Sequence, residues 1–169
     1  GIFRAEHATN AQFVWSATAA GFASGSAQEF YPGSEYVQWV AADGYNRYPS
    51  TSWEEVDDIF TPFYSWAVAT RKPLLVSEGG STTDPANPMR LRDWLVSAER
   101  WVVSHTRIRA WVYNDALSPT GFDFRVTSST GLPALRVTSV VLGRPPPGFG
   151  CVGGDLPPPG WRAYCPGGL

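Results

Sequence analysis

Cysteine is scarce in this sequence: two occur among 169 residues, Cys151 and Cys165, and both lie close to the C-terminus. Two cysteines alone do not make a zinc site, so no metal centre is expected. In an exported protein the pair would be bridged, and closing so short a loop stabilises the fold by about 3 kcal/mol at best. The alternative is two reduced surface thiols.

Long apolar runs and an excess of charge are also missing. No stretch of about 18 apolar residues occurs, so no membrane-spanning helix is expected, and no signal peptide is visible. The formal net charge of −2 gives no electrostatic reason to expect nucleic acid or an anionic membrane as a partner. Nothing in the sequence points to a cofactor. The chain opens with Gly1, and residues 2–6 read as the last turns of a helix, so we expect a piece of a longer protein.

Aromatic residues, by contrast, are plentiful, with eight Trp, seven Tyr and nine Phe. The hydrophobic fraction of 43% and the charged fraction of 17% are typical of a globular chain. Proteins that hold sugars need flat apolar platforms, but aromatic side chains more often fill a core. Both interpretations stay open from composition alone.

Strand patterns alternate with helix patterns along the chain. Strands are predicted at residues 11–17, 36–42, 74–77 and 108–113, with a loop at 18–33. A helix should begin at Ser52, which has capping-box spacing to Glu55, and Pro62 should either kink it or mark a fresh start. Further helices are predicted around residues 91–102 and 132–141. This alternation favours an α/β fold with a parallel sheet.

Residues 143–169 differ in composition from the rest. They hold seven Pro and eight Gly, which form neither a core nor a long helix. The predicted organisation is therefore an α/β unit at 1–142 and a Pro/Gly-rich tail at 143–169.

Polar and aromatic groups follow three of the predicted strands. Glu78 arrives where the apolar run at 74–76 stops, Asp43 and Tyr45 follow the second strand, and Tyr113 with Asn114 end the fourth. In parallel α/β folds the carboxyl ends of strands carry functional groups, so we expect a site here. The alternative for Glu78 is a side chain that pairs with an Arg or caps the next helix.

Four stretches, in order, resemble glycoside hydrolase family 26, which comprises retaining enzymes, mostly β-mannanases, on a (β/α)8 barrel. Residues 31–40 (YPGSEYVQWV) with 43–46 (DGYN) resemble its strand 6 and are the most specific. The others are 2–6 (IFRAE) with 9–15 (TNAQFVW), 72–79 (KPLLVSEG) and 124–129 (FRVTSS), which resemble helix 4 with strand 5, strand 7, and the segment after strand 8. The resemblance covers residues 2–141 and implies a partial TIM barrel, strands 5 to 8 with their helices.

The resemblance implies roles for individual residues. Glu78 would be the catalytic nucleophile, and Tyr45 would hydrogen-bond its carboxylate. Candidates for substrate binding are Trp15, Trp111, Tyr113, Asn114 and Asp43. For the three aromatic residues a core role is the alternative, and Asp43 would either orient its neighbours or close a turn.

The family's acid/base Glu lies at the end of strand 4, upstream of this chain. Retaining hydrolysis needs two carboxyls about 5–5.5 Å apart, so the missing N-terminal half of the barrel is an expected partner. The resemblance implies a fragment of a secreted endo-β-glycanase acting on β-1,4-linked polysaccharide, with mannan as the expected substrate and no turnover by the fragment alone. The alternatives are a non-catalytic polysaccharide-binding barrel and an inactive truncated product.

Overall fold

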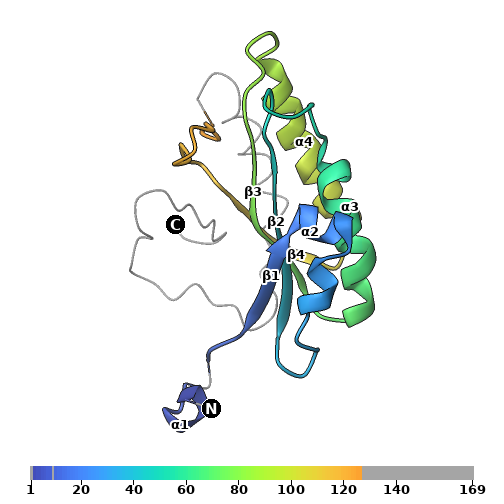
Figure 1. Ribbon diagram of the computed structural model, residues 1–169, viewed down its shortest axis with the longest axis vertical. Helices are drawn as coiled ribbons and strands as arrows, with labels where there is room; N and C mark the ends of the chain where they lie inside the picture. The colour runs from blue at the N-terminus through green and yellow to red at the C-terminus, as the bar shows by residue number, and fades with distance from the viewer. Residues whose placement is uncertain (1, 9, 127–169) are drawn as a thin grey trace, which may run out of the picture.

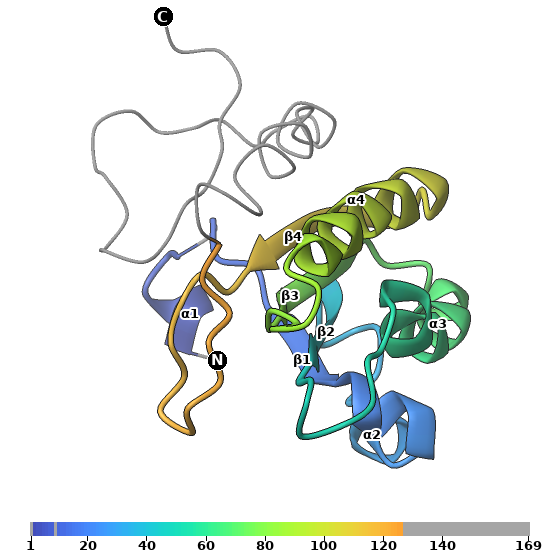
Figure 2. The ribbon, with the colours of Figure 1, turned by 90° about the horizontal axis from the view of Figure 1, so that it is seen from above.

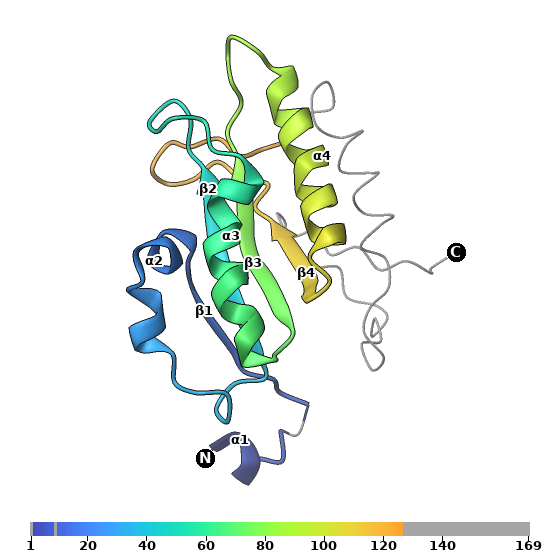
Figure 3. The same cartoon turned by 90° about the vertical axis from the view of Figure 1, so that its right-hand side faces the viewer.

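A computed structural model describes residues 2–8 and 10–126 of the chain. Four parallel strands form a sheet in this part, in the order β1 (Val14–Thr18), β2 (Trp39–Asn46), β3 (Leu74–Ser81) and β4 (Ile108–Tyr113). Helices α2 (Ala19–Ser24), α3 (Val56–Ala67) and α4 (Met89–Ser104) cover one face of the sheet (Figures 1 and 3). The predicted α/β fold with a parallel sheet is confirmed, and β4 has the predicted bounds.

Three short helices complete the described part. They are α1 (Ile2–Ala5), which the sequence predicted as the last turns of a helix, and the 3-10 turns η1 (Ala27–Phe30) and η2 (Val68–Thr70). Within residues 2–8 and 10–126 no helix is long and apolar enough to cross a membrane. The predicted helix at 132–141, the tail at 143–169 and the bridge between Cys151 and Cys165 lie outside the described residues.

The hydrophobic core lies between the sheet and the helices. Val40 and Ala42 of β2, Val76 of β3, and Phe60 and Phe63 of α3 are completely buried there. The predicted apolar face of α4 is confirmed, because its six residues are all buried: Leu91, Trp94, Leu95, Ala98, Trp101 and Val102. Burying one such side chain stabilises the fold by about 1.5–3 kcal/mol, so this layer fixes the position of the strands.

The loop predicted at 18–33 is wrong, since α2 and η1 lie within it. The Thr18 side chain accepts a hydrogen bond from the Gly21 N–H and so caps α2. Phe22 is only 3% exposed, and its burial compensates for the weak helix propensity of a Gly- and Ser-containing segment. Gly25, with a φ of 84°, ends the helix in the left-handed conformation that glycine adopts easily.

The start of α3 also differs from the prediction. The capping box uses Glu55 and Asp58 instead of Ser52 and Glu55, so the helix begins at Val56. Pro62 lies inside α3, which neither stops nor restarts there. The burial of Phe60 and Phe63 on either side of Pro62 holds both halves of the helix against the sheet, and this outweighs the missing backbone hydrogen bond.

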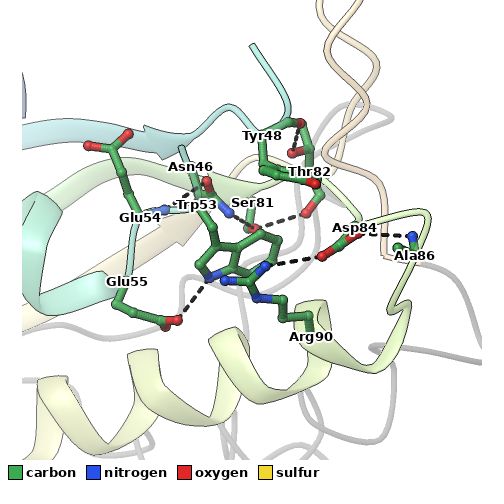
Figure 4. Close-up of polar contacts among 10 residues, drawn as sticks. All are labelled: Asn46, Tyr48, Trp53, Glu54, Glu55, Ser81, Thr82, Asp84, Ala86 and Arg90. Atoms are coloured by element: carbon green, nitrogen blue, oxygen red, sulfur yellow. Dashed lines mark hydrogen bonds and ion pairs between the residues drawn. The ribbon is translucent and has the colours of Figure 1, made fainter. Parts of the chain in front are cut away.

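A buried polar network joins the loops that follow β2 and β3 (Figure 4). The Asn46 amide donates to the Ser81 hydroxyl at 2.9 Å and accepts from the Glu54 N–H at 3.2 Å. The Thr82 hydroxyl donates to the Tyr48 carbonyl at 2.6 Å. Nearby, the Arg90 guanidinium lies 4.2 Å from the centre of the Trp53 ring. These contacts fix both loops relative to the sheet.

Replacing Asn46 with Ala is expected to lower the free energy of unfolding by about 2 kcal/mol, because it leaves the buried Ser81 hydroxyl and Glu54 N–H without this partner. Urea denaturation of the two proteins measures the difference. Thr106→Ala, at an exposed position, is the matched control and should change stability by less than about 0.5 kcal/mol. Equal stability of Asn46→Ala and the wild type would show that the network contributes nothing.

Candidate active site

The two faces of the sheet differ in what covers them. Val40 and Ala42 of β2 face the helices, as does Gly44, where a Cβ atom would lie 2.5 Å from Ile59 of α3. Because successive side chains of a strand alternate, Asp43 and Tyr45 point to the opposite face. We call it the helix-free face, because α2, α3 and α4 do not cover it (Figure 2). Both residues are half-buried on that face.

A β-bulge in β3 decides where Glu78 points. Ala42 pairs with Val76, and the next residue of β2, Asp43, pairs with Glu78, so that Ser77 is an extra residue. Val76 faces the helices, and simple alternation would send Glu78 to the same side. The extra residue reverses this, and Glu78 projects on the helix-free face with Tyr45.

Two hydrogen bonds show that the helix-free face is concave. The hydroxyls of Ser16 on β1 and Ser77 on β3 lie 2.7 Å apart, although β2 runs between these strands. In a flat sheet, strands two places apart are separated by about 9–10 Å. The Asn114 amide, just after β4, likewise reaches over β3 to donate to the Tyr45 hydroxyl at 3.1 Å. The sheet therefore curves around the side that carries Glu78.

Tyr45, Glu78 and Asn114 form one hydrogen-bonded group on this concave face. The Tyr45 hydroxyl donates to Oε2 of Glu78 and accepts from Asn114. Burial, followed by the hydrogen bond to Glu78, raises the pKa of Tyr45 to about 12, so the phenol stays a donor at neutral pH. In the described part of the chain the other oxygen of Glu78, Oε1, accepts no hydrogen bond, and Glu78 is exposed.

The alternatives for Glu78 do not fit this geometry. Within the described ranges no Arg or Lys forms an ion pair with Glu78. The next helix, α4, starts at Met89 and has Pro88 as its N-cap, so Glu78 does not cap it. Among the described residues, Glu78 thus has one carboxylate oxygen without a hydrogen bond and a phenol that fixes its orientation.

Asp43 provides a second carboxyl beside Glu78. Burial, and then the negative charge of Glu78, raise the pKa of Asp43 above its ordinary value. Because its pKa is higher in the folded than in the unfolded state, the proton on Asp43 stabilises the fold at acidic pH. That stabilisation is lost as the pH rises through the folded-state pKa.

In the Glu78→Gln variant the pKa of Asp43 is expected to fall, because the neighbouring negative charge is gone, yet to stay raised, because burial remains. Carbon-13 NMR titration of the Asp carboxyl groups measures this pKa. Glu29→Gln removes an exposed carboxylate on η1 and should leave Asp43 unchanged. An identical Asp43 titration in Glu78→Gln and wild type would contradict the coupling between the two carboxyls.

Two of the predicted substrate-binding aromatics lie on the other face. Trp15 packs against Phe22, Tyr31 and Trp66, with ring centres 5.1–5.8 Å apart. Trp111 packs under the helices, and its ring would lie 2.6 Å from a Cβ atom on Gly79. Strand alternation turns both rings towards the core, so neither lies on the face that carries Glu78. The alternative core role fits them instead.

Of the remaining predicted residues, four lie on the concave face and one, Tyr113, packs against the core. Asp43, Tyr45, Glu78 and Asn114 come together on the concave face. Tyr113 packs against the core, and its hydroxyl donates to the Phe124 carbonyl at 2.9 Å, so it anchors the segment after β4. Burial raises the pKa of the Tyr113 phenol well above its ordinary range.

Sequence reasoning missed two residues next to Tyr45, Phe124 and Arg47, and a third, Phe122, that lies beside both of them. The Phe124 ring lies 4.7 Å from the Tyr45 ring, and the Arg47 guanidinium lies 4.9 Å from the centre of that ring and 5.8 Å from that of Phe122. Phe124 belongs to a stretch that the sequence singled out, and Arg47 directly follows another. Sequence spacing does not predict that Arg47 meets Phe122 and Phe124. The two Phe residues reach the site only because the loop after β4 folds back towards it.

No protein-family model matches the chain. Among curated proteins, Endoglucanase H of Acetivibrio thermocellus is 29% identical over 134 residues, which are 76% of this chain and 14% of that protein. The chain therefore spans about 14% of the length of this relative. Among solved structures, a triple mutant of an endo-β-1,4-glucanase from Xanthomonas axonopodis pv. citri aligns with a TM-score of 0.39 and 11% identity. That alignment covers 61% of this chain and 36% of the glucanase.

Proposed function

We propose that this chain forms the C-terminal half of the catalytic barrel of a retaining endo-β-glycanase, with Glu78 as the nucleophile. The observation that carries the proposal is the hydrogen bond from Tyr45 to Glu78 on the concave face, near the carboxyl ends of parallel strands. Similarity over most of the chain to a protein named as an endoglucanase supports the same activity.

The curvature of the sheet supports a barrel. In the described part, β1 and β4 are edge strands, and α2, α3 and α4 all lie on the face opposite the concave one (Figure 2). Closing such a sheet into a (β/α)8 barrel takes about 250 residues in total, so four further strands would come from outside this chain. Those strands would pair with both edges and complete the wall opposite Glu78.

The C-terminal half of the barrel would supply the nucleophile of the reaction. Oε1 of Glu78 would attack the anomeric carbon, while the Tyr45 hydroxyl holds Oε2 and keeps the carboxylate aligned. The acid/base must protonate the leaving oxygen from the other side of the scissile bond. Asp43 does not meet this need, because it pairs directly with Glu78 on the adjacent strand and so lies in the same wall. The second carboxyl would come from the other half of the barrel.

Two polysaccharides are candidates for the substrate. The family resemblance favours β-1,4-mannan, whereas the name of the curated relative favours a β-glucan. Both are extracellular polymers, so the proposal includes a secreted protein. The contacts that discriminate sugar hydroxyls would come partly from loops outside this chain.

Assay of the full-length protein on mannan, mixed-linkage glucan, β-1,4-glucan and xylan tests the proposal. We expect hydrolysis of one of the first three with internal cleavage, seen as a fast fall in viscosity. Proton NMR of the first products should show the β-anomer, as retention requires. Absence of reducing-sugar release from all four polymers, or an α-anomer as first product, would overturn it.

A further inference from the structure

The β-bulge that turns Glu78 is visible from both neighbouring strands. Towards β2, Val76 and Glu78 pair with consecutive residues, so that Ser77 is passed over. Towards β4, Val76 and Gly79 pair with residues that are two apart, so two residues of β3 stand opposite one of β4. Glu78 is thus the second residue of a bulge in the middle of the sheet.

A bulge residue is held less firmly by the sheet than its neighbours are. The extra residue has no partner across the ladder, which is locally disrupted at that point. Here the side chains of both Ser77 and Glu78 lie on the concave face, where simple alternation would place only one of them. A further contact is needed to hold the two side chains in this orientation.

The Ser77 hydroxyl supplies such a contact. It lies 2.7 Å from the Ser16 hydroxyl of β1, on the far side of the intervening strand β2 (Figure 3). Among the described residues, neither hydroxyl has another hydrogen-bond partner. Ala41 of β2 pairs with Ser16 and is completely buried. Because its side chain is a single methyl group, it leaves room for the two hydroxyls to meet above it.

The offset between the two serines is the one that a closed barrel imposes. Ser16 pairs with Ala41, which pairs with Leu75, so Ser77 lies two residues beyond the position level with Ser16. In a (β/α)8 barrel the pairing shifts by about one residue per strand, and alternate strands contribute the side chains of one inner layer. Ser16 and Ser77 therefore fit one such layer, directly before Glu78 along β3.

Serine is an unusual choice for this layer. Bulky branched residues dominate the inner layers of such barrels, because those layers are a packed core. Two hydroxyls fill less space, but a hydrogen bond between them fixes a distance and a direction, which apolar contacts do not. The pair is therefore better suited to orienting the bulge than to filling the barrel.

We propose that Ser16 is a positioning residue for the nucleophile: its hydrogen bond to Ser77 holds the bulge of β3, and with it the carboxylate of Glu78, in the orientation needed for attack. The inference rests on the proposed function. It goes beyond that function by assigning a role to a residue of β1 that does not touch Glu78. Tyr45 would fix the carboxylate itself, and Ser16 the backbone that carries it.

The test isolates the attack by Glu78 in the full-length protein. The probes are the dinitrophenyl β-glycosides of cellobiose and mannobiose, with fluorine in place of the hydroxyl next to the anomeric carbon. Oε1 of Glu78 bonds to that carbon, the bond to the leaving oxygen breaks, and dinitrophenolate departs with the electron pair, without needing a proton. Because the fluorine slows hydrolysis of the glycosyl ester, each active site releases one burst of dinitrophenolate. The rate constant of the burst measures the attack, and its amplitude measures the share of folded protein.

Ser16→Ala and Ser77→Ala are each expected to lower the burst rate constant about tenfold at unchanged amplitude, because a slightly displaced carboxylate attacks more slowly. The double variant should lose no more than either single one, since both remove the same hydrogen bond. Ser24→Ala is the matched control. It removes one hydroxyl from another serine pair, Ser24 with Ser26 at 2.9 Å, at the end of α2, and should keep the wild-type rate constant.

Two outcomes would contradict the inference. One is a burst rate constant in Ser16→Ala and Ser77→Ala equal to that of Ser24→Ala. The other is a lower amplitude with an unchanged rate constant, which would show a role in folding alone. A wild-type protein that gives no burst with either probe would instead refute the proposed function.

In that case carbon-13 NMR titration of Asp43 still decides on the role of Ser16. The negative charge of Glu78 contributes to the raised pKa of Asp43. If Ser16 holds Glu78 in place, the pKa of Asp43 should be lower in Ser16→Ala than in Ser24→Ala, because the charge moves away. Equal pKa values of Asp43 in the two variants would show that Ser16 does not position Glu78.

Discussion

Hydrolysis by the full-length protein is expected to fall about 10⁵-fold when Glu78 is replaced with Gln, as happens when a catalytic nucleophile is lost. The amide has nearly the same shape and still accepts the hydrogen bond from Tyr45, so the fold and the site geometry should persist. A neutral amide oxygen, however, does not form the glycosyl ester on which retention depends. Reducing-sugar release from the cleaved polysaccharide measures the effect.

Two further variants make this prediction specific. Glu78→Ala leaves a space that a small anion such as azide fills, so added azide should restore part of the activity and give a product of inverted configuration. Glu29→Gln, an exposed change on η1, should retain full activity. A Glu78→Gln protein that keeps more than about a tenth of the wild-type rate would remove Glu78 from the mechanism.

Tyr45→Phe is expected to lower kcat about 10²-fold, with little change in stability. The substitution removes the donor to Glu78 and the acceptor for Asn114, but it keeps the ring that packs against Phe124 and Arg47. Loss of one positioned hydrogen-bond donor typically costs a factor of this size. Steady-state kinetics measures kcat, and circular dichroism monitors folding. Tyr36→Phe, at a 64% exposed tyrosine, is the control.

The pH dependence separates a role in alignment from a role in proton transfer. Since the pKa of Tyr45 is raised to about 12, its phenol stays protonated throughout the neutral range and cannot cause a loss of activity near pH 7 or 8. With the folded-state pKa above the unfolded value of 10.0, the proton on Tyr45 stabilises the fold below pH 10, and this is lost as the pH approaches 12. Tyr45→Phe should therefore lower the rate by the same factor at pH 5 and pH 8. A factor that varies steeply between them would contradict the alignment role.

Much of the fold could be predicted from local patterns. The spacing of Leu91, Trp94, Leu95, Ala98, Trp101 and Val102 identifies the buried face of α4, and the apolar run before Glu78 identifies β3 as a buried parallel strand. Where the predicted secondary structure was wrong, tertiary packing outweighed the local preference of the residues. The weak helix propensity of residues 19–24 yields to the burial of Phe22, and Pro62 is tolerated because its neighbours are anchored in the core.

Sequence alone determined which residue types stand at the ends of the parallel strands, because period and composition are properties of short segments. It therefore placed Asp43, Tyr45, Glu78, Tyr113 and Asn114 together at the strand ends, although Tyr113 packs against the core in the structure. Only the tertiary structure decided on which face each side chain lies. The position of a residue within a strand predicts the face of its side chain only while the alternation is unbroken. The extra residue Ser77 breaks the alternation just before Glu78. The same alternation turns Trp15 and Trp111 into the core, and the curvature of the sheet brings Ser16 to Ser77 and Asn114 to Tyr45. These contacts join strands that are not neighbours, so their formation depends on the bend of the whole sheet.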